Sequence, residues 1–319
     1  MFSWRTTSIF VSLLCLLTAW GARAWAGAWP MKKGGMYNRI AFNYYESDRL
    51  YDKSGDSRPM PNGGRFYDRN LSWYGEYGLT GRLTLISTIY YKWLSYHDRY
   101  IHDRSQGVGD LEIGARYNLI AKPLVLSIQG LVKYGELYGS EDPEIGDGQN
   151  DYEVRLLAGK SLWPFPGYAG LEVGYRFRSG SPSDEVRYLA EVGMNFTTRL
   201  YGRVKLDGVW GVGNAASHST PPSLPQGKGA TLGDLLKASL GTGVHSSSPG
   251  SAGPAGGLRA VSAGSNPSLA PEYDLIKLDI TLGCNLSRHL GLEAQYTPVI
   301  YGERIGKGWT SSLALVYQW

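Results

Sequence analysis

The sequence predicts an all-β fold, a transmembrane antiparallel up-and-down β-barrel of about twelve strands. Three observations support this prediction. Segments in which apolar and polar residues alternate recur along the chain, most of these segments are roughly ten residues long, and short connections alternate with longer ones. An alternation with period two indicates a strand whose two faces meet different surroundings.

The N-terminus has the features of an export signal. Arg5 precedes an apolar run from Ile9 to Trp20, and Ala24-Trp25-Ala26 is a cleavage site of the A-x-A type. The apolar run is too short to span a bilayer as a helix. We therefore expect residues 1–26 to be a signal peptide and residues 27–319 to form the exported barrel.

Charge and cysteine content exclude two other classes of protein. The whole chain carries a net charge of +4, and the signal contributes two basic residues and no acidic one, so the exported part carries +4 − 2 = +2. This charge is too small to indicate a nucleic-acid partner. Cys284 is the single cysteine left after cleavage, so no internal disulfide stabilises the exported protein.

Each predicted strand has an apolar row on one face and a polar row, usually charged, on the other. In the segment 107–119, Leu111 and Ile113 alternate with Asp110 and Glu112. Strands of a soluble sandwich are typically five or six residues long, whereas membrane barrels need about ten. The predicted strands are 36–45, 71–79, 81–93, 107–119, 124–134, 151–162, 170–178, 187–196, 203–210, 275–286, 291–301 and 309–319.

The connections predict the orientation of the barrel. Long connections at 46–65, 94–106, 139–149, 179–185, 213–272 and 302–307 alternate with tight ones at 80–81, 121–123, 163–167, 197–199 and 287–289. Outer-membrane barrels have short periplasmic turns and longer external loops. We therefore expect both chain ends to be periplasmic, in the outer membrane of a Gram-negative bacterium. The Gly/Ser/Pro-rich segment 214–271 reads as a flexible external loop, and it is the strongest candidate for a gate.

The polar faces of the strands supply the candidate site, a charge-lined lumen. Acidic and basic residues nearly balance, which predicts salt bridges between neighbouring strands and a narrow interior. Arg155, Arg176 and Arg187 are the first candidates for a basic patch near mid-barrel. The predicted lumen-lining residues are Arg82, Lys92, Asp110, Glu112, Arg116, Lys133, Glu153, Arg155, Glu172, Arg176, Arg187, Glu191, Arg203, Lys205, Asp207, Lys277, Asp279 and Glu293.

The last strand resembles the signal that the outer-membrane assembly machinery reads. Ser312, Ala314, Tyr317 and Trp319 give a polar residue, a small residue and two aromatic residues at the end of the chain. We expect Tyr317 and Trp319 to act as this assembly signal. The expected partners are therefore the assembly machinery and outer-membrane lipid, together with a small solute in the lumen.

The sequence carries no recognisable catalytic, cofactor or metal motif. His97 and His102 are the best-placed potential bases, in a predicted external loop, but no nucleophile motif accompanies them and their spacing matches no known metal site. We therefore expect no enzyme activity, cofactor or metal. A barrel enzyme that acts on lipid is the less favoured reading.

The segments 107–119, 150–162 and 166–196 resemble the transporter-like barrels named for the MetA pathway of phenol degradation, in which a Gly-Asp-Leu strand opens a central pair of hairpins. The resemblance implies an outer-membrane channel for small aromatic or apolar compounds and brings no catalytic residues. Together with the charged lumen it predicts passive diffusion of a small solute. The alternative is a sealed structural barrel that serves as an anchor, adhesin or assembly partner.

Overall fold

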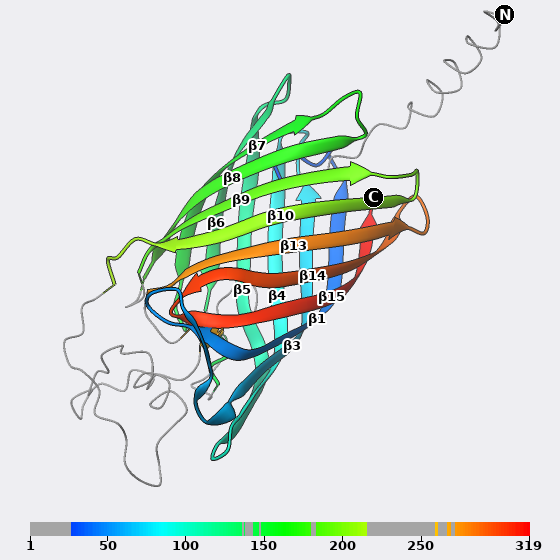
Figure 1. Ribbon diagram of the computed structural model, residues 1–319. Helices are drawn as coiled ribbons and strands as arrows, with labels where there is room; N and C mark the ends of the chain where they lie inside the picture. Colours follow the sequence, from blue (N-terminus) through cyan, green and yellow to red (C-terminus); the bar gives the residue numbers. More distant parts are fainter. Residues whose placement is uncertain are drawn as a thin grey trace, which may run out of the picture.

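The computed structural model describes residues 27–135, 137, 143–146, 148–179, 183–215, 259–260, 267–268 and 272–319. Within these residues, twelve long antiparallel strands form one sheet that closes because β15 pairs with β1 (Figure 1). The closed barrel confirms the predicted fold class. Its strands are β1 (Met36–Tyr51), β3 (Arg65–Gly78), β4 (Leu83–His97), β5 (His102–Ile120), β6 (Val125–Tyr134), β7 (Asp151–Ser161), β8 (Gly167–Arg178), β9 (Glu185–Asn195), β10 (Leu200–Gly211), β13 (Asp274–Asn285), β14 (Leu290–Glu303) and β15 (Ile305–Gln318).

Three short strands and one helical turn belong to the connections. The strand β2 (Ser57–Pro59) pairs with the end of β1, and the 3-10 turn η1 (Pro61–Gly63) follows it. The strands β11 (Arg259–Ala260) and β12 (Pro267–Ser268) pair with each other, and Ser268 pairs with Ile305 of β15. The described residues contain no helix long and apolar enough to cross a membrane.

The two faces of the sheet differ as the alternation predicts. On the outer face of β8, Leu171, Val173 and Phe177 expose more than half of their surface, while Arg176 on the inner face is 2% exposed. A row of exposed aliphatic and aromatic side chains around a closed sheet suits contact with lipid, where every backbone group must pair within the wall. The barrel therefore has the architecture of a bacterial outer-membrane protein.

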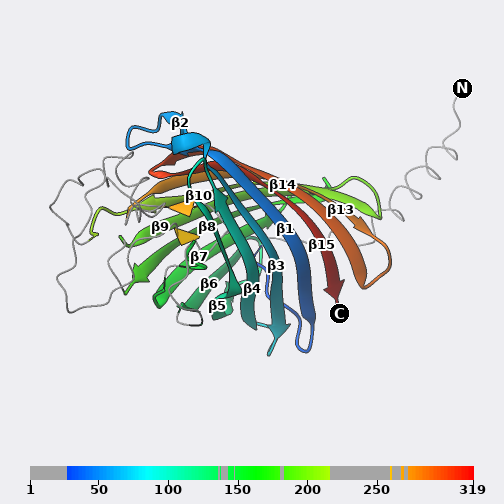
Figure 2. The same cartoon turned by 90° about the horizontal axis from the view of Figure 1, so that it is seen from below.

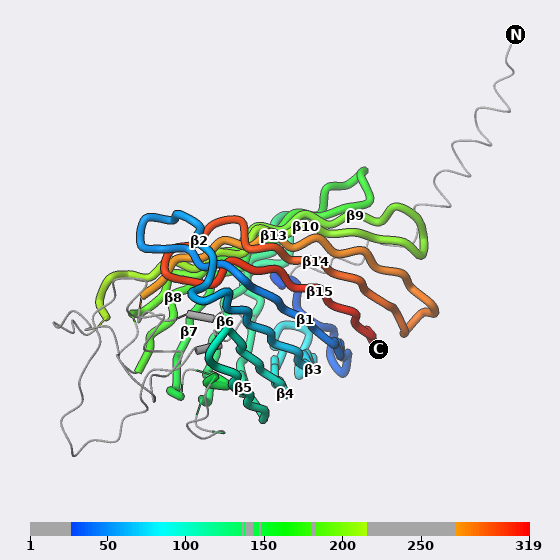
Figure 3. The backbone as a smooth tube through the Cα atoms, turned by 60° about the horizontal axis from the view of Figure 1, so that its bottom comes forward, coloured from blue at the N-terminus to red at the C-terminus, as the bar shows by residue number. Residues whose placement is uncertain are grey.

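The connections divide the barrel into two ends. We call one the turn end: it carries the five turns β3–β4, β5–β6, β7–β8, β9–β10 and β13–β14, and the described chain enters and leaves the sheet there at Met36 and Trp319 (Figures 1 and 3). The opposite end, with the connections β1–β3, β4–β5, β6–β7, β8–β9, β10–β13 and β14–β15, is the loop end. In outer-membrane barrels the short turns face the periplasm.

Two of the connections predicted to be long are short, and this part of the prediction is wrong. Strands β4 and β5 continue pairing so that only residues 98–101 connect them, and Arg304, in the left-handed region with φ 55°, alone separates β14 from β15. The 98–101 turn is closed by Asp98, whose side chain accepts the N–H groups of Tyr100 and Ile101. The physical reason is that the inward face of these strand ends is no longer polar, since Tyr96 and Ile305 are buried apolar side chains, so the alternation fades although the pairing continues.

A segment at the start of the described chain enters the lumen. Residues 27–35, which we call the entry segment, cross the interior at the turn end (Figure 2). Ser127 Oγ donates to the Ala28 carbonyl oxygen at 2.6 Å, and the Met31 N–H donates to Thr84 Oγ1 at 2.9 Å. Ala28 is buried with Val125 and Leu157, and Trp29 packs beside them. The interior is therefore occupied at this end by the chain itself.

Apolar clusters fill the interior near the loop end. The Ile145 cluster contains Tyr45, Leu50, Met60, Phe66, Leu94, Tyr96 and Ile145. The Ile305 cluster contains Tyr51, Val209, Tyr273, Leu275, Val299 and Ile305. Ile145 comes from the β6–β7 connection, which therefore folds inward. The predicted signal peptide 1–26 and nearly all of the predicted flexible loop 214–271 lie outside the described residues.

Candidate functional site: a charge-lined cavity in the barrel lumen

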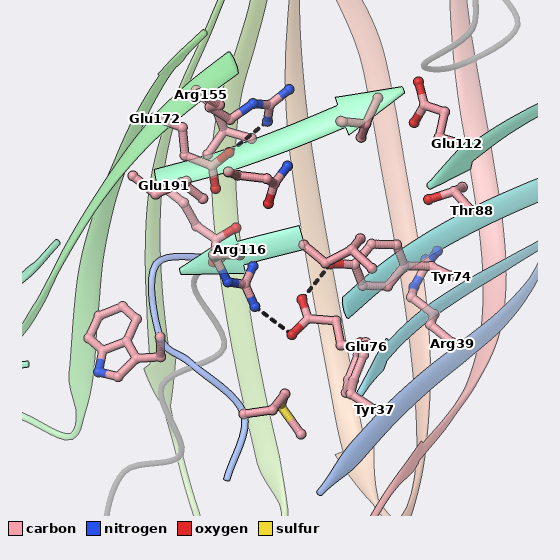
Figure 4. Close-up of a pocket in the computed structure, with 18 of the residues that line it drawn as sticks. Tyr37, Arg39, Tyr74, Glu76, Thr88, Glu112, Arg116, Arg155, Glu172 and Glu191 are labelled. Atoms are coloured by element: carbon pink, nitrogen blue, oxygen red, sulfur yellow. Dashed lines mark hydrogen bonds and ion pairs between the residues drawn. The ribbon is translucent and has the colours of Figure 1, made fainter. Parts of the chain in front are cut away.

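A cavity of about 780 Å³ occupies the lumen between the entry segment and the loop-end clusters. Its described lining includes Trp29 and Trp319 at the turn end and reaches Glu112, Arg187 and Asp207 on the strands, but it includes no residue of the Ile145 or Ile305 cluster. Figure 4 shows charged side chains from β1, β3, β5, β7, β8 and β9 around this space. The strands position them because each inward residue is two positions from the next.

Glu153 of β7 is the centre of the first ion-pair network. Its Oε1 lies 2.6 Å from Arg155 Nη2, and its Oε2 lies 2.8 Å from Arg176 Nε and 3.7 Å from Arg187 Nη1. Arg176 also reaches Glu112 Oε1 at 3.0 Å. The structure thus brings together the three arginines predicted to form a basic patch, around one buried carboxylate.

Further pairs neutralise the other side of the lumen. Glu293 of β14 accepts from Arg39 at 2.9 Å and from Arg203 at 3.0 Å, and Tyr201 also donates to it at 3.0 Å. These residues lie on three strands, β1, β10 and β14; β15 lies between β1 and β14, and β13 lies between β14 and β10. A carboxylate that accepts several charge-assisted hydrogen bonds is held in one geometry.

Glu76 anchors a third group beside the entry segment. Arg116 Nη2 lies 2.6 Å from Glu76 Oε2, and the Tyr74 hydroxyl donates to the same carboxylate (Figure 4). The Tyr37 ring packs edge-on against Tyr74 with ring centroids 6.1 Å apart. The cavity wall therefore combines ionised groups with aromatic surface.

Nearer the loop end the charges are buried among themselves. Lys133 Nζ lies 2.6 Å from Asp151 and 3.7 Å from Asp110, and Lys92 Nζ donates to the Ile145 carbonyl oxygen at 3.0 Å. None of these residues lines the described cavity. Their contacts join the wall to the inward β6–β7 connection, which is a structural role.

The structure places the predicted lumen residues in three groups. Those in the cavity lining are Glu112, Arg116, Arg155, Glu172, Arg176, Arg187, Glu191, Arg203, Lys205, Asp207 and Asp279. Those that point inward without being in this lining are Lys92, Asp110, Lys133, Glu153, Lys277 and Glu293. Arg82 lies in the β3–β4 turn, exposed, because β4 begins one residue later at Leu83.

Several lining residues fall outside the predicted set. Arg39 and Tyr37 come from β1, whose alternation is the least regular, although their odd numbers share the inward face with Ala41. That parity is the signal that could have identified Arg39. Trp29 and Lys32 come from the entry segment, which has no alternation and gave no signal.

The C-terminal aromatic residues complete the turn end. Tyr317 is part of the outer face, and Trp319 stacks on His289 with ring centroids 5.0 Å apart. The Trp319 N–H donates to the Met36 carbonyl oxygen at 2.9 Å, which joins the last residue to the first strand. Their role as an assembly signal stays a prediction. Among the described residues, no group of three or more His, Cys, Asp or Glu is arranged to hold a metal ion.

Comparison with known proteins supports the architecture. No family model matches the chain, and no curated protein matches it. The COG4313 outer membrane channel from Pseudomonas putida F1 is similar to it with a TM-score of 0.60 and 14% identity, over 92% of this chain and 98% of that one. At these identities the similarity shows the fold, a closed barrel like those of outer-membrane channels.

Two other solved barrels are similar at lower scores. The KdgM porin in complex with disordered oligogalacturonate has a TM-score of 0.44 and 9% identity, over 88% of this chain and 98% of that one. The CymD monoaromatic hydrocarbon channel has a TM-score of 0.40 and 7% identity, over 91% of this chain and 89% of that one.

Proposed function

We propose that this protein is an outer-membrane channel through which a small solute diffuses along a charge-lined lumen. The observation that carries the proposal is the cavity of about 780 Å³ enclosed by the barrel wall and lined by ionised side chains. A wall of fixed charges and hydrogen-bonding groups can replace part of the hydration of a polar solute while it passes.

In this proposal the channel is gated, because both ends of the lumen are obstructed. The entry segment crosses the turn end, and the Ile145 and Ile305 clusters fill the loop end. Apolar constrictions of this kind stop ions by excluding water. Because these obstructions lie at opposite ends of one path, passage requires movement at both ends.

The solute class in the proposal is small aromatic or apolar compounds that carry some polar group. Trp29, Tyr37, Tyr74 and Tyr90 supply aromatic surface in the cavity wall beside the charges. The resemblance of residues 107–196 to the barrels of the MetA pathway of phenol degradation supports the same class. This proposal also includes membership of that family, export by the signal 1–26, and assembly through Tyr317 and Trp319.

A sealed structural barrel is the second candidate function. Its support is the extent of mutual neutralisation: buried carboxylates such as Glu153 and Glu293 each contact at least two guanidinium groups. Such pairs fix the wall and need no solute.

Planar bilayer recording with the purified protein separates the two functions. A channel gives discrete current steps in potassium chloride, and a variant lacking residues 29–33 gives larger steps because the entry segment no longer crosses the lumen. Folding of both proteins is checked by the shift in gel mobility between heated and unheated samples. If neither protein gives current steps while both are folded, the barrel is sealed and the channel proposal is wrong.

A further inference from the structure

We infer that the lumen contains a binding subsite for one small organic carboxylate, and that Arg187 of β9 is the residue that recognises it. The inference rests on the proposed channel function and specifies the charge of its solute. The balance of acidic and basic residues in the sequence gives no such preference; a preference arises from the charge that the structure leaves without a close partner.

Arg187 differs from the other basic residues that the barrel strands contribute to the cavity wall. Each of the others has a carboxylate oxygen within 3.0 Å; they are Arg39, Arg116, Arg155, Arg176, Arg203 and Lys205. Among the described residues, the only carboxylate within 4.0 Å of Arg187 is Glu153, at 3.7 Å. Arg187 Nε is buried with no hydrogen-bond partner, as are Arg116 Nε and Arg203 Nε, so the distance to the carboxylate is what distinguishes Arg187. Its side chain is 8% exposed and lines the cavity.

The register places Arg187 in a row of paired residues that runs across the four adjacent strands β6, β7, β8 and β9. None of the four residues in this row is a carboxylate. Gln129 of β6 pairs with Arg155 of β7, which pairs with Gly174 of β8, which pairs with Arg187. On the far side of Gln129 the row continues to Arg116 of β5. Because Gly174 has no side chain, nothing on β8 separates the two arginines in this row.

The carboxylates that balance these arginines lie partly outside the cavity surface. Among the described lining residues eight are Lys or Arg and six are Asp or Glu. Glu153 and Glu293, which pair at 3.0 Å or less with four arginines between them, are buried and do not line the cavity. The cavity surface that a solute meets is therefore more basic than the barrel wall as a whole. Asp207 is the lining acid on the adjacent strand β10, and it is paired with Lys277 at 3.5 Å.

The geometry suits a carboxylate rather than a neutral group. A guanidinium presents a planar fork of donors that a carboxylate accepts at two oxygens, and a buried donor without a partner is costly to leave unpaired. A carboxylate that enters the cavity would give the terminal nitrogens of Arg187 a closer acceptor than Glu153. Gln129, Thr88 and Tyr90 in the same cavity wall offer neutral polar and aromatic contacts to the rest of a small molecule.

Ligand-detected fluorine NMR with the purified barrel in detergent tests this inference. The probes are 4-fluorobenzoate, the neutral 4-fluorobenzamide and the cation 4-fluorobenzylammonium, which share one ring and differ in charge. We expect 4-fluorobenzoate to bind more tightly than either of the other two. We expect R187Q to weaken benzoate binding about tenfold, as loss of a charged hydrogen bond predicts, and to leave benzamide binding unchanged.

Two further variants control for general electrostatics. R82Q removes an exposed arginine from the β3–β4 turn, outside the cavity, and should leave benzoate binding unchanged. D207N removes a negative charge from the cavity wall and should tighten benzoate binding. All variants are first shown to be folded by the gel shift on heating.

Equal binding of the three probes by the wild type would overturn the inference, as would an R187Q protein that is folded and binds benzoate normally. Because binding is measured without current, the two proposals fail separately. A barrel that binds benzoate through Arg187 but never conducts refutes the channel function. A barrel that conducts but does not prefer benzoate refutes the carboxylate subsite.

Discussion

Replacing Glu153 by Gln should destabilise the barrel more than any comparable change at the cavity surface. The Glu153 carboxylate is 1% exposed and contacts Arg155 at 2.6 Å and Arg176 at 2.8 Å. Removing one partner of a buried ion pair costs about 3–5 kcal/mol, because the remaining charge stays buried without compensation. Arg155 is 19% exposed towards the cavity, which reduces the penalty, so we expect a loss of about 2–3 kcal/mol.

The matched control is E172Q. Among the described residues, Glu172 forms an ion pair with Arg155 only, at 2.7 Å, and it is 13% exposed, so its loss should cost about 1 kcal/mol or less. Both proteins would be refolded into lipid vesicles and unfolded in urea, with tryptophan fluorescence as the readout and an unchanged dependence on urea as the check for a two-state comparison. Equal losses for E153Q and E172Q, or a loss below about 0.5 kcal/mol for E153Q, would refute the reasoning from burial.

Three further predictions follow from the ends of the lumen and from one loop carboxylate. In G159A the new methyl group would lie about 2.3 Å from the ring of Trp29, so the indole must move and single-channel conductance should rise. In the control G130A the space around the new methyl group is open, and the conductance should not change. Equal conductance of the two variants would contradict the assignment of Trp29 as an obstruction. I145A removes a fully buried side chain from the loop-end cluster, which costs about 2–4 kcal/mol of local packing, and should increase the frequency of open events in bilayer recordings; an unchanged frequency would exclude the cluster as a barrier. At Asp184, burial opposes ionisation, but the N–H of Arg178 and the side chain of Asn214 donate to the carboxylate and hold its pKa below the usual value. The ionised Asp184 carboxylate stabilises the β8–β9 connection above about pH 4, and this effect is lost as the pH falls through the lowered pKa. The protection factor of the Arg178 amide, which corrects for the slower intrinsic exchange in acid, should therefore fall in acid, and D184N should lack that dependence.

The barrel itself could be predicted because lipid and water impose a clear difference between the two faces of each strand. In β8, the apolar Leu171 and Val173 alternate with Glu172, and the structure places them outside and inside the wall. The same reasoning explains why the strand ends were predicted too short. Around residues 95–106 the inward Tyr96 belongs to the apolar Ile145 cluster while outward positions such as Ser95 and Arg104 are polar, so the apolar-outside pattern disappears while the hydrogen-bonded ladder continues from His97 to His102.

The contacts of the site could be predicted only where they are local. Glu153 and Arg155 are two residues apart on one strand, so their contact follows from strand geometry. The contact between Arg176 of β8 and Glu112 of β5 depends on the register of three successive strand pairs and on the curvature of the closed wall, which no single segment encodes. The entry segment could not be predicted for a different reason: it packs as an extended chain inside the lumen and has no face pattern of its own.

A barrel wall with nearly equal numbers of acidic and basic residues can therefore still enclose a lumen that selects solutes by charge. Equal numbers of opposite charges say nothing about selectivity until the register decides which of them pair closely and which line the cavity. Here Glu153 lies within hydrogen-bonding distance of Arg155 and Arg176 but 3.7 Å from Arg187, and it is itself buried away from the cavity surface. One guanidinium is left to interact with whatever enters the lumen. Because its neighbours are already neutralised, changing this residue alone should alter the preference for charge while most of the network that stabilises the wall stays in place.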